Sequence, residues 1–232
     1  MPRDPRVIPR LYPILDAGSF ANANAMLAAA QGLVVAGCTL LQYRNKSGNA
    51  RLMLEQAREL KRVLRGQRQD PHFSQNHGEG GHPHSDEINV SVRLIMNDRA
   101  DLCLAAEFDG VHVGQDDLSA EAVRAMIGPD RWLGVSTHNP EQLREADLTS
   151  ADYLAIGPVF ATTSKEKPDP VVGLEGVRRA RALTRKPLVA IGGITRVNAA
   201  SVIEAGADSV AVISDLIETP RKSAEEFLRI LG

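Results

Sequence analysis

The stretch VRLIMNDRADLCLAAEFDGVHVGQDD, residues 92–117, decides the fold of this chain. Its two short apolar runs, 92–96 and 111–113, predict strands, and the segment 100–107 between them has a helical pattern. A strand, a helix and a second strand in so few residues are typical of two parallel strands joined by a crossover helix. Polar side chains follow each strand, so any chemistry is expected where these strands end.

The same alternation recurs along the whole chain. Apolar runs predict strands at 11–15, 39–43, 92–96, 110–113, 132–135, 153–156, 188–191 and 209–213. Helical patterns alternate with them at 21–35, 50–64, 100–107, 120–127, 140–147, 174–184, 197–205 and 224–231. Most of the strands are apolar throughout, as parallel strands covered on both faces should be. Eight such units predict an α/β protein with a single (β/α)8 TIM barrel domain over 1–232. A doubly wound open sheet is the alternative, but the number and even spacing of the units favour a closed barrel.

One stretch does not fit the alternation. Residues 66–91 are polar, rich in Gly and His, and without periodicity. The stretch falls between a helix and the following strand, on the face of a barrel that usually serves stability rather than chemistry. Its histidines raise the idea of a metal site, but their irregular spacing favours a flexible insertion with no catalytic part.

Composition excludes several functional classes. The formal net charge of -2 gives no electrostatic case for binding nucleic acid or an acidic membrane. No apolar run reaches the roughly 20 residues that a membrane span needs. The two cysteines, Cys38 and Cys103, lie in apolar stretches where a buried free thiol is the common case. We expect a cytoplasmic enzyme acting on small molecules, and the sequence is compatible with a homo-oligomer.

A basic segment follows the second predicted strand. Alternate residues of an extended segment point to one side, so Gln42, Arg44 and Lys46 can converge on one ligand. An arginine fork beside a lysine point charge suits a diphosphate. A solvated basic turn is the alternative, but the position of this loop beside the acidic ones favours ligand binding.

Acidic residues follow the third and fourth predicted strands. Asn97 and Asp98 come after the first of these, and Asp116 and Asp117 after the second. Carboxylates at neighbouring strand ends, facing a basic loop, predict a Mg²⁺ site that handles phosphate. Each aspartate could instead cap the next helix. His112 lies between two valines, and we interpret it as a structural residue hydrogen-bonded across the barrel.

The loops after the fifth and sixth predicted strands carry hydroxyl groups. Ser136 is interpreted as a hydrogen-bond donor to substrate, because no serine-nucleophile motif surrounds it. His138 is either a proton acceptor or part of the turn into the next helix. In the sixth loop, three hydroxyls at 162–164 precede Lys165, which indicates a phosphate-binding or lid segment.

The seventh and eighth predicted strands end in small residues. Gly192 and Gly193 expose backbone N–H groups that can bind an anion, and Ser214 follows one strand later. Barrel enzymes often hold a phosphate between these two loops.

Together these motifs resemble the thiamine-phosphate synthase family, from residue 11 to residue 214. The markers are QYRNK at 42–46, ND at 97–98, GVHVGQDD at 110–117, GVS at 134–136, GP at 157–158, TTSK at 162–165, GG at 192–193 and VIS at 212–214. Ser164 stands where the family often has threonine, which keeps the hydroxyl. The insertion at 66–91 is the main departure, and it lies away from these motifs.

The resemblance implies a role for each matched residue. The pyrimidine diphosphate is expected to contact Gln42, Tyr43, Arg44, Asn45, Lys46, Asn97, Ser136 and Lys165. The thiazole phosphate is expected to contact Thr162, Thr163, Ser164, Gly193, Ile213 and Ser214. Asp98 and Asp117 are expected to hold Mg²⁺, and Arg44, Lys46, Ser136 and Lys165 to serve catalysis.

The implied reaction joins a pyrimidine diphosphate to a thiazole phosphate and releases pyrophosphate. It needs no covalent nucleophile, because the pyrimidine can lose diphosphate to give a stabilised methylene cation. Two rivals remain: another phosphate-binding barrel enzyme, such as a sugar-phosphate isomerase or a thiazole tautomerase, and a barrel that binds ligand without catalysis. The first needs an acid–base pair and no metal at Asp98 and Asp117. The second would have lost a metal carboxylate or a diphosphate cation.

Overall fold

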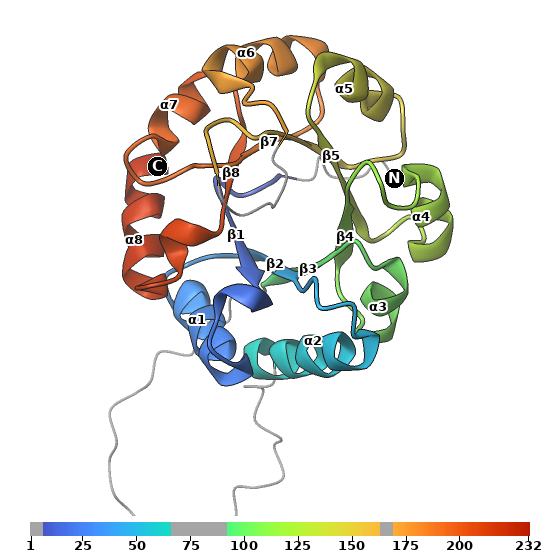
Figure 1. Ribbon diagram of the computed structural model, residues 1–232, viewed down its shortest axis with the longest axis vertical. Helices are drawn as coiled ribbons and strands as arrows, with labels where there is room; N and C mark the ends of the chain where they lie inside the picture. Colours follow the sequence, from blue (N-terminus) through green and yellow to red (C-terminus); the bar gives the residue numbers. More distant parts are fainter. Residues whose placement is uncertain (1–6, 66–91, 163–168) are drawn as a thin grey trace, which may run out of the picture.

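A computed structural model describes residues 7–65, 92–162 and 169–232 of the chain. Within these residues eight parallel strands pair in chain order, and β1 pairs with β8 to close the barrel (Figure 1). The strands are β1 (Leu11–Asp16), β2 (Leu40–Arg44), β3 (Arg93–Asn97), β4 (Gly110–Val113), β5 (Trp132–Thr137), β6 (Tyr153–Ile156), β7 (Leu188–Ile191) and β8 (Ser209–Val212). The predicted (β/α)8 barrel is confirmed, and the open sheet is excluded.

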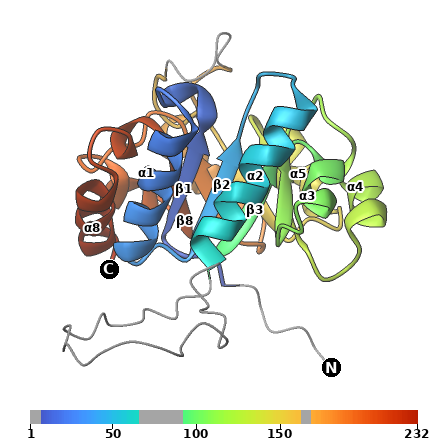
Figure 2. The same cartoon turned by 90° about the horizontal axis from the view of Figure 1, so that it is seen from below.

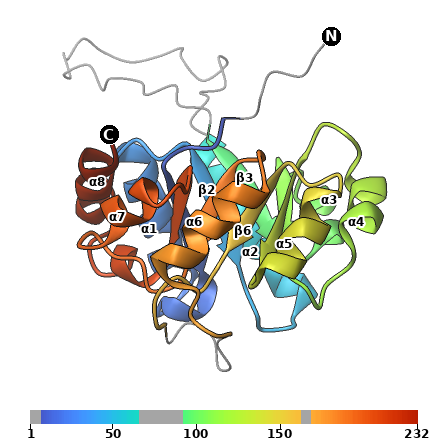
Figure 3. The ribbon, with the colours of Figure 1, turned by 90° about the horizontal axis from the view of Figure 1, so that it is seen from above.

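A ring of helices covers the outside of the barrel, as the two side views show (Figures 2 and 3). They are α1 (Ala23–Val35), α2 (Ala50–Arg65), α3 (Ala100–Ala105), α4 (Ala120–Ile127), α5 (Pro140–Asp147), α6 (Gly173–Leu183), α7 (Ala199–Glu204) and α8 (Pro220–Leu231). Two short 3₁₀ helices, η1 (Ala17–Ser19) and η2 (Ser214–Leu216), follow β1 and β8.

Predicted and observed boundaries agree to within two residues, apart from the start of α8. This helix begins at Pro220 rather than at residue 224. Proline is favoured in the first helical turn, where its missing N–H would have had no helical partner. Side chains of Asn22, Ser119 and Asn139 cap α1, α4 and α5 by accepting backbone N–H groups.

The barrel has two separate apolar layers because side chains alternate along each strand. One set points outward and packs against the helices. The other set fills the barrel interior, and its members include Tyr12, Ile14, Leu40, Ile95, Trp132, Tyr153, Val189 and Ala211. Several strands have further inward-facing residues beyond this interior layer. These residues therefore line the mouth of the barrel at the carboxyl ends of the strands.

An aspartate–arginine pair closes the opposite end of the barrel at three places. Asp152, just before β6, accepts the N–H of Leu133 in β5 at 2.8 Å and pairs with Arg124 of α4 at 2.6 Å. Asp109 before β4 and Asp208 before β8 make the corresponding contacts. Each accepts an N–H of the preceding strand and pairs with an arginine of the helix before that strand. Each pair ties a helix end to two strands, so this face serves stability.

The predicted insertion at 66–91 lies outside the described residues. Its flanking residues do not: Arg65, at the end of α2, donates to the carbonyl of Val92 at 3.3 Å. Arg65 and Val92 thus lie close together at the face where helices return to strands. Among the helices of the described residues, none has the length and apolar character that a membrane crossing requires.

Candidate active site

The carboxyl ends of the first five strands bring the polar residues together. Asp16, Arg44, Asn97 and Ser136 all belong to inward-facing positions at the ends of β1, β2, β3 and β5. Strand pairing places Asp16 beside Arg44, in register. The barrel thus concentrates charged and hydrogen-bonding groups at one mouth, the place where barrel enzymes carry out chemistry.

The basic residues after β2 are both paired with carboxylates. Arg44 donates to Asp16, and Lys46 Nζ lies 2.5 Å from Asp98 Oδ2. Gln42 lies deeper in the barrel and is 3% exposed. The three predicted contacts Gln42, Arg44 and Lys46 therefore do face one region. The pairings hold the two cations toward the mouth of the barrel.

Tyr43 and Asn45, from the same segment, lie elsewhere. Tyr43 points outward into the layer between sheet and helices, where it is fully buried and donates to Gln56 of α2 at 2.7 Å. Asn45 donates to Gln56 and to the Tyr43 oxygen, and its own oxygen accepts the Ser47 N–H at 2.8 Å. In the structure these two side chains shape the loop that carries Lys46.

Asp98 adopts a backbone conformation that is rare for a side-chain-bearing residue. Its φ is 62°, in the left-handed region, which costs roughly 1 kcal/mol outside glycine. Its N–H is held by the carbonyl of His112 at 2.7 Å. Strain of this kind is common where a side chain must be aimed. Here the carboxylate faces Lys46.

Asp117 lies close to Asp98 although it follows a different strand. Partial burial raises the pKa of the Asp117 carboxyl, and the neighbouring Asp98 carboxylate raises it further by charge and by a side-chain hydrogen bond. The N–H of Gly114 opposes both effects by donating to Asp117 Oδ2 at 2.7 Å. Two carboxylates this close favour a cation between them.

The alternative capping role of these two aspartates is not observed. Ser119 caps α4, with its oxygen accepting the N–H of Ala122 at 3.3 Å. At the start of α3 the cap position is Arg99, and no side-chain capping bond forms there within the described residues. Asp98 and Asp117 are therefore available for another purpose.

The donor set fits Mg²⁺ held partly by substrate. No cluster of three or more His, Cys, Asp or Glu suited to a metal occurs within 7–65, 92–162 and 169–232. Mg²⁺ in phosphate-transfer sites commonly takes one or two carboxylates, with phosphate oxygens and waters completing its shell. Two carboxylates whose mutual repulsion raises one pKa match that pattern.

A chain of hydrogen bonds crosses the barrel below the mouth. Gln42 Nε2 donates to the Tyr12 hydroxyl at 3.0 Å, which lies 2.9 Å from the Tyr153 hydroxyl. Tyr153 contacts His112 Nδ1 at 3.0 Å, and His112 Nε2 contacts Ser136 Oγ at 2.8 Å. Burial lowers the pKa of His112 to about 4, so the ring is neutral at pH 7. The interpretation of His112 as a histidine bonded across the barrel is confirmed.

Asn97 faces the mouth with an unused donor. The residue is 8% exposed, and Nδ2 is buried without a hydrogen-bond partner among the described residues. Asn97 pairs in register with His112, beside the chain of hydrogen bonds. A buried amide N–H without a partner is unfavourable by about 1–3 kcal/mol, and a ligand oxygen would satisfy it.

The loops after β6 and β7 are packed together by two glycines. Gly192 and Gly193 both have positive φ, and a Cβ on Gly193 would lie 2.5 Å from the Ala161 carbonyl oxygen. Phe160 N–H donates to the Gly192 carbonyl at 3.0 Å. This packing holds Phe160 and Ala161, which precede Thr162, against the Gly192–Gly193 turn.

The remaining predicted phosphate contacts divide into two groups. Ile213 follows β8, and the exposed Ser214 begins η2. Thr163, Ser164 and Lys165 lie outside the described residues, so their predicted contacts stay predictions.

His138 joins two loops. Its Nδ1 donates to the Gly157 carbonyl at 2.6 Å, and its Nε2 lies 3.5 Å from a carboxylate oxygen of Asp169. The histidine therefore links the end of β5 to the loop after β6, which favours the structural reading of its position.

Comparison with known proteins identifies the family of this chain. A family model described as thiamine monophosphate synthase matches residues 87–216. The thiamine-phosphate synthase of Koribacter versatilis is 55% identical over 227 residues, which cover 97% of this chain and 96% of that protein. The chain belongs to the thiamine-phosphate synthase family. The resemblance drawn from the motifs is thus confirmed.

A second sequence relative and one solved structure match the same family. The thiamine-phosphate synthase of Chloroflexus aurantiacus is 40% identical over 208 residues, 90% of this chain and 85% of that protein. The solved structure of a thiamine phosphate pyrophosphorylase from Pyrococcus furiosus superimposes with a TM-score of 0.75 at 31% identity. That match covers 96% of this chain and 95% of the other.

Sequence reasoning missed three residues that the structure brings into this candidate site. Asp16 follows the first strand as Asp98 follows the third, so the same rule would have identified it. Tyr12 and Tyr153 lie inside strands and were indistinguishable from apolar core residues. Only the closed barrel places their hydroxyl groups against Gln42 and His112.

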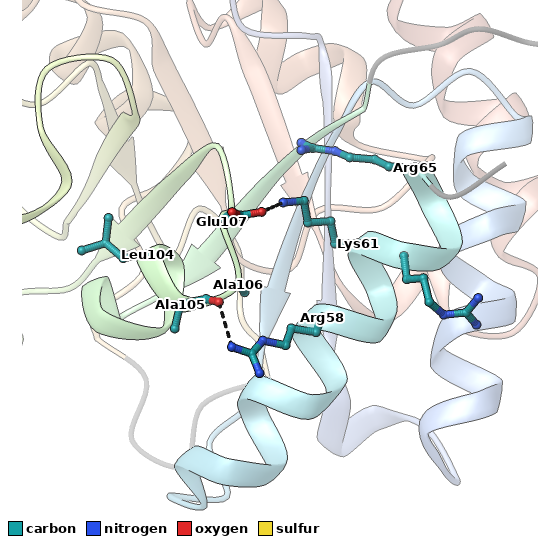
Figure 4. A pocket seen from close by; sticks show the side chains of 8 residues that line it. Arg58, Lys61, Arg65, Leu104, Ala105, Ala106 and Glu107 are labelled. Carbon is teal, nitrogen blue, oxygen red and sulfur yellow. Dashed lines mark hydrogen bonds and ion pairs between the residues drawn. The ribbon is translucent and has the colours of Figure 1, made fainter. Parts of the chain in front are cut away.

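A hollow of about 620 Å³, lined by none of the candidate-site residues, lies between α2 and α3 (Figure 4). Its cationic side chains are engaged in local contacts. Arg58 donates to the Ala105 carbonyl at 3.3 Å, Lys61 pairs with Glu107 at 2.6 Å, and Arg65 pairs with Asp109. These contacts tie the two helices together, so we assign the hollow a structural role.

Proposed function

We propose that this protein is a Mg²⁺-dependent thiamine-phosphate synthase, a transferase of the alkyl, non-methyl type. It joins 4-amino-2-methyl-5-(diphosphomethyl)pyrimidine to the phosphate of hydroxyethylthiazole or its carboxylated form, and releases pyrophosphate. Membership of the family makes the chain an enzyme of thiamine biosynthesis. The observation that supports the Mg²⁺ dependence and the release of diphosphate is the convergence of four charged residues at one mouth of the barrel: Arg44, Lys46, Asp98 and Asp117.

The leaving diphosphate is the group that this mouth suits best. Arg44 and Lys46 provide positive charge at the end of β2, and Asn97 and Ser136 add hydrogen-bond donors from β3 and β5. Lys165, assigned by the family resemblance, adds a further cation. Negative charge grows on the diphosphate as its bond to carbon breaks, so fixed positive groups stabilise that transition state more than the bound substrate.

Asp98 and Asp117 would hold Mg²⁺ against the diphosphate. When bound, the ion supplies charge neutralisation to the leaving group. Lys46 contacts Asp98 at 2.5 Å, so the Asp98 carboxylate also orients a cation of the chain itself toward the same region. The protein's share of the work is to align these groups before reaction, which avoids reorganisation at the transition state.

The second substrate is proposed to lie under the loops after β6, β7 and β8. Its phosphate would contact the Gly193 turn, Ile213 and Ser214, together with the hydroxyls of 162–164. The support is the close packing of the Gly192–Gly193 turn on residues 158–161. Fixing the thiazole there would align its nitrogen for capture of the pyrimidine cation.

The first alternative, a sugar-phosphate isomerase or thiazole tautomerase, needs an acid–base pair, and the histidines of the described residues do not form one. Both ring nitrogens of His112 are engaged, and His138 donates Nδ1 to a backbone carbonyl. Neither is poised as a free acid–base pair over one substrate. The rival without catalysis is disfavoured because Arg44, Lys46, Asp98 and Asp117 are all present.

A direct assay tests the proposal. Purified protein is mixed with both substrates and Mg²⁺, and thiamine phosphate and pyrophosphate are measured together. Equal amounts of the two products are expected, with loss of turnover in EDTA and recovery when Mg²⁺ is restored. Intact protein that makes no product would refute the activity, and turnover unchanged by EDTA would refute the metal dependence.

A further inference from the structure

The hydrogen-bond chain beneath the mouth has a fixed direction. Gln42 presents Nε2, which can only donate, to the Tyr12 oxygen at 3.0 Å. The Tyr12 hydroxyl therefore donates its own hydrogen to its other partner, the Tyr153 hydroxyl oxygen, at 2.9 Å. Tyr153 in turn donates to His112 Nδ1 at 3.0 Å. Each tyrosine hydroxyl has a single proton to donate, so the direction set at Gln42 passes along the hydrogen-bond chain.

This direction determines the tautomer of His112. A neutral imidazole carries one proton, and an Nδ1 that accepts from Tyr153 leaves that proton on Nε2. The Nε2–H then donates to Ser136 Oγ at 2.8 Å. Ser136, having accepted this bond, is free to direct its hydroxyl hydrogen away from the ring. Ser136 is part-exposed at the end of β5, so that hydrogen faces the mouth.

The absence of a side chain at Gly134 leaves space for this chain of hydrogen bonds. His112, Gly134 and Tyr153 are adjacent in register on β4, β5 and β6. A Cβ on Gly134 would lie 2.3 Å from His112 Nδ1 and 2.1 Å from Tyr153 Cζ. Only glycine therefore lets the two rings meet across the intervening strand. Their centroids are 5.5 Å apart.

We propose that Tyr12, Tyr153 and His112 are positioning residues, whose directed hydrogen bonds hold His112 in the Nε2–H tautomer and thereby fix Ser136 as a donor toward the substrate. Tyr153 makes the contact that selects the tautomer. Tyr12 only orients Tyr153. The inference deepens the proposed function, on which it rests for the identity of the group that Ser136 meets.

The tautomer is measured first, without turnover. Full-length protein labelled with ¹⁵N in histidine is examined by NMR at pH 7, and the His112 signals are identified by their loss in His112→Gln. Wild-type protein is expected to show a protonated Nε2 and an unprotonated Nδ1. Tyr153→Phe should move proton population to Nδ1, and Tyr12→Phe should do so to a smaller extent, because Tyr153 then keeps its contact with Nδ1 but loses the donor that sets its direction. A wild-type Nδ1–H ring would overturn the proposal.

Kinetics then test the action on Ser136. Tyr153→Phe should lower kcat about tenfold, the effect of one misdirected hydrogen bond, with KM for both substrates within about twofold. Tyr12→Phe should change kcat less than about threefold. In a Ser136→Ala background the effect of Tyr153→Phe should vanish, because both changes remove the same contact. An undiminished tenfold effect in that background would show that Tyr153 acts by another route.

Stability and activity controls keep the outcomes separate. Thermal melting of each variant excludes loss of fold as the cause, and the wild-type tautomer remains decisive if Tyr153→Phe is unstable. If the wild-type protein makes no thiamine phosphate, the proposed function fails while the tautomer result still stands. If it is active but Tyr153→Phe is folded and retains full kcat, only the positioning role fails.

Discussion

Lys46 and Asp98 are separated by 52 residues in the chain, yet Lys46 Nζ lies 2.5 Å from Asp98 Oδ2. The two residues follow β2 and β3, which are neighbouring parallel strands, so both loops leave the sheet at the same edge. The pair unites the basic loop and the acidic loop in one site. Asp117, brought close to Asp98 from the end of β4, completes it.

Asp117→Asn should abolish Mg²⁺-dependent turnover and leave the fold intact. The amide oxygen can still accept the Gly114 N–H that Asp117 accepts at 2.7 Å, but the charge is gone. Loss of one such electrostatic contact corresponds to about 3 kcal/mol, or at least about a hundredfold in kcat. Turnover is measured against Mg²⁺ concentration, with melting curves alongside. The exposed Asp116→Asn is the matched control, and equal losses in both variants would contradict the assignment.

Asp16→Asn should weaken the use of the pyrimidine diphosphate. The carboxylate of Asp16 pairs with Arg44, and both side chains are largely buried, so the change leaves the guanidinium less firmly oriented. We expect kcat/KM for this substrate to fall about tenfold, equivalent to one ordinary hydrogen bond. Initial rates at varied pyrimidine diphosphate measure it. Asp101→Asn, at an exposed pair with Arg99, should have no effect. Unchanged kinetics in Asp16→Asn would show that Arg44 needs no partner.

The free energy of unfolding should fall as the pH is lowered from 7 to 4, partly because of His112. Burial lowers the pKa of its ring to about 4, and the charge of Asp117 only partly opposes this. The unfolded chain, with an ordinary pKa near 6.5, therefore binds more protons in this window, and His112 alone contributes a loss of about 3 kcal/mol.

Denaturant unfolding at several pH values measures the slope. His112→Gln, which cannot titrate, should show a shallower fall than the wild-type protein over the same range. Equal slopes in the two proteins would mean that His112 is not held neutral by the fold.

Arg124→Met should destabilise the barrel without touching its chemistry. Arg124 donates to Asp152 at 2.6 Å and to the carbonyls of Gly128, Arg131 and Ser150. Loss of Arg124 leaves a mostly buried carboxylate without this cation. We therefore expect the free energy of unfolding to fall by about 3 kcal/mol.

Denaturant unfolding at neutral pH checks this value. The control is Arg144→Met, whose exposed pair with Glu141 at 3.5 Å should contribute less than about 0.5 kcal/mol. Similar losses in the two variants would remove the distinction between the buried and exposed pairs.

Strand ends were predictable because their signal is local. Apolar runs such as 110–113 and 153–156 coincide with β4 and β6, since a strand covered on both faces needs apolar side chains throughout. The start of α8 was less predictable, because Pro220 permits a first turn without requiring one. The placement of Tyr43 and Asn45 also required the structure: strand alternation turns the first outward, and the second folds back onto Gln56.

The sequence by itself determined the eight repeated units, the polar groups that follow them and the family to which they belong. These features depend on composition and spacing within a few residues. The tertiary structure alone decided which polar groups meet. The Asp16–Arg44 pair, the closeness of Asp98 and Asp117, and the path from Tyr12 through Tyr153 to His112 all join different strands. Barrel closure and register create these contacts, and neither is encoded in any single segment of the chain.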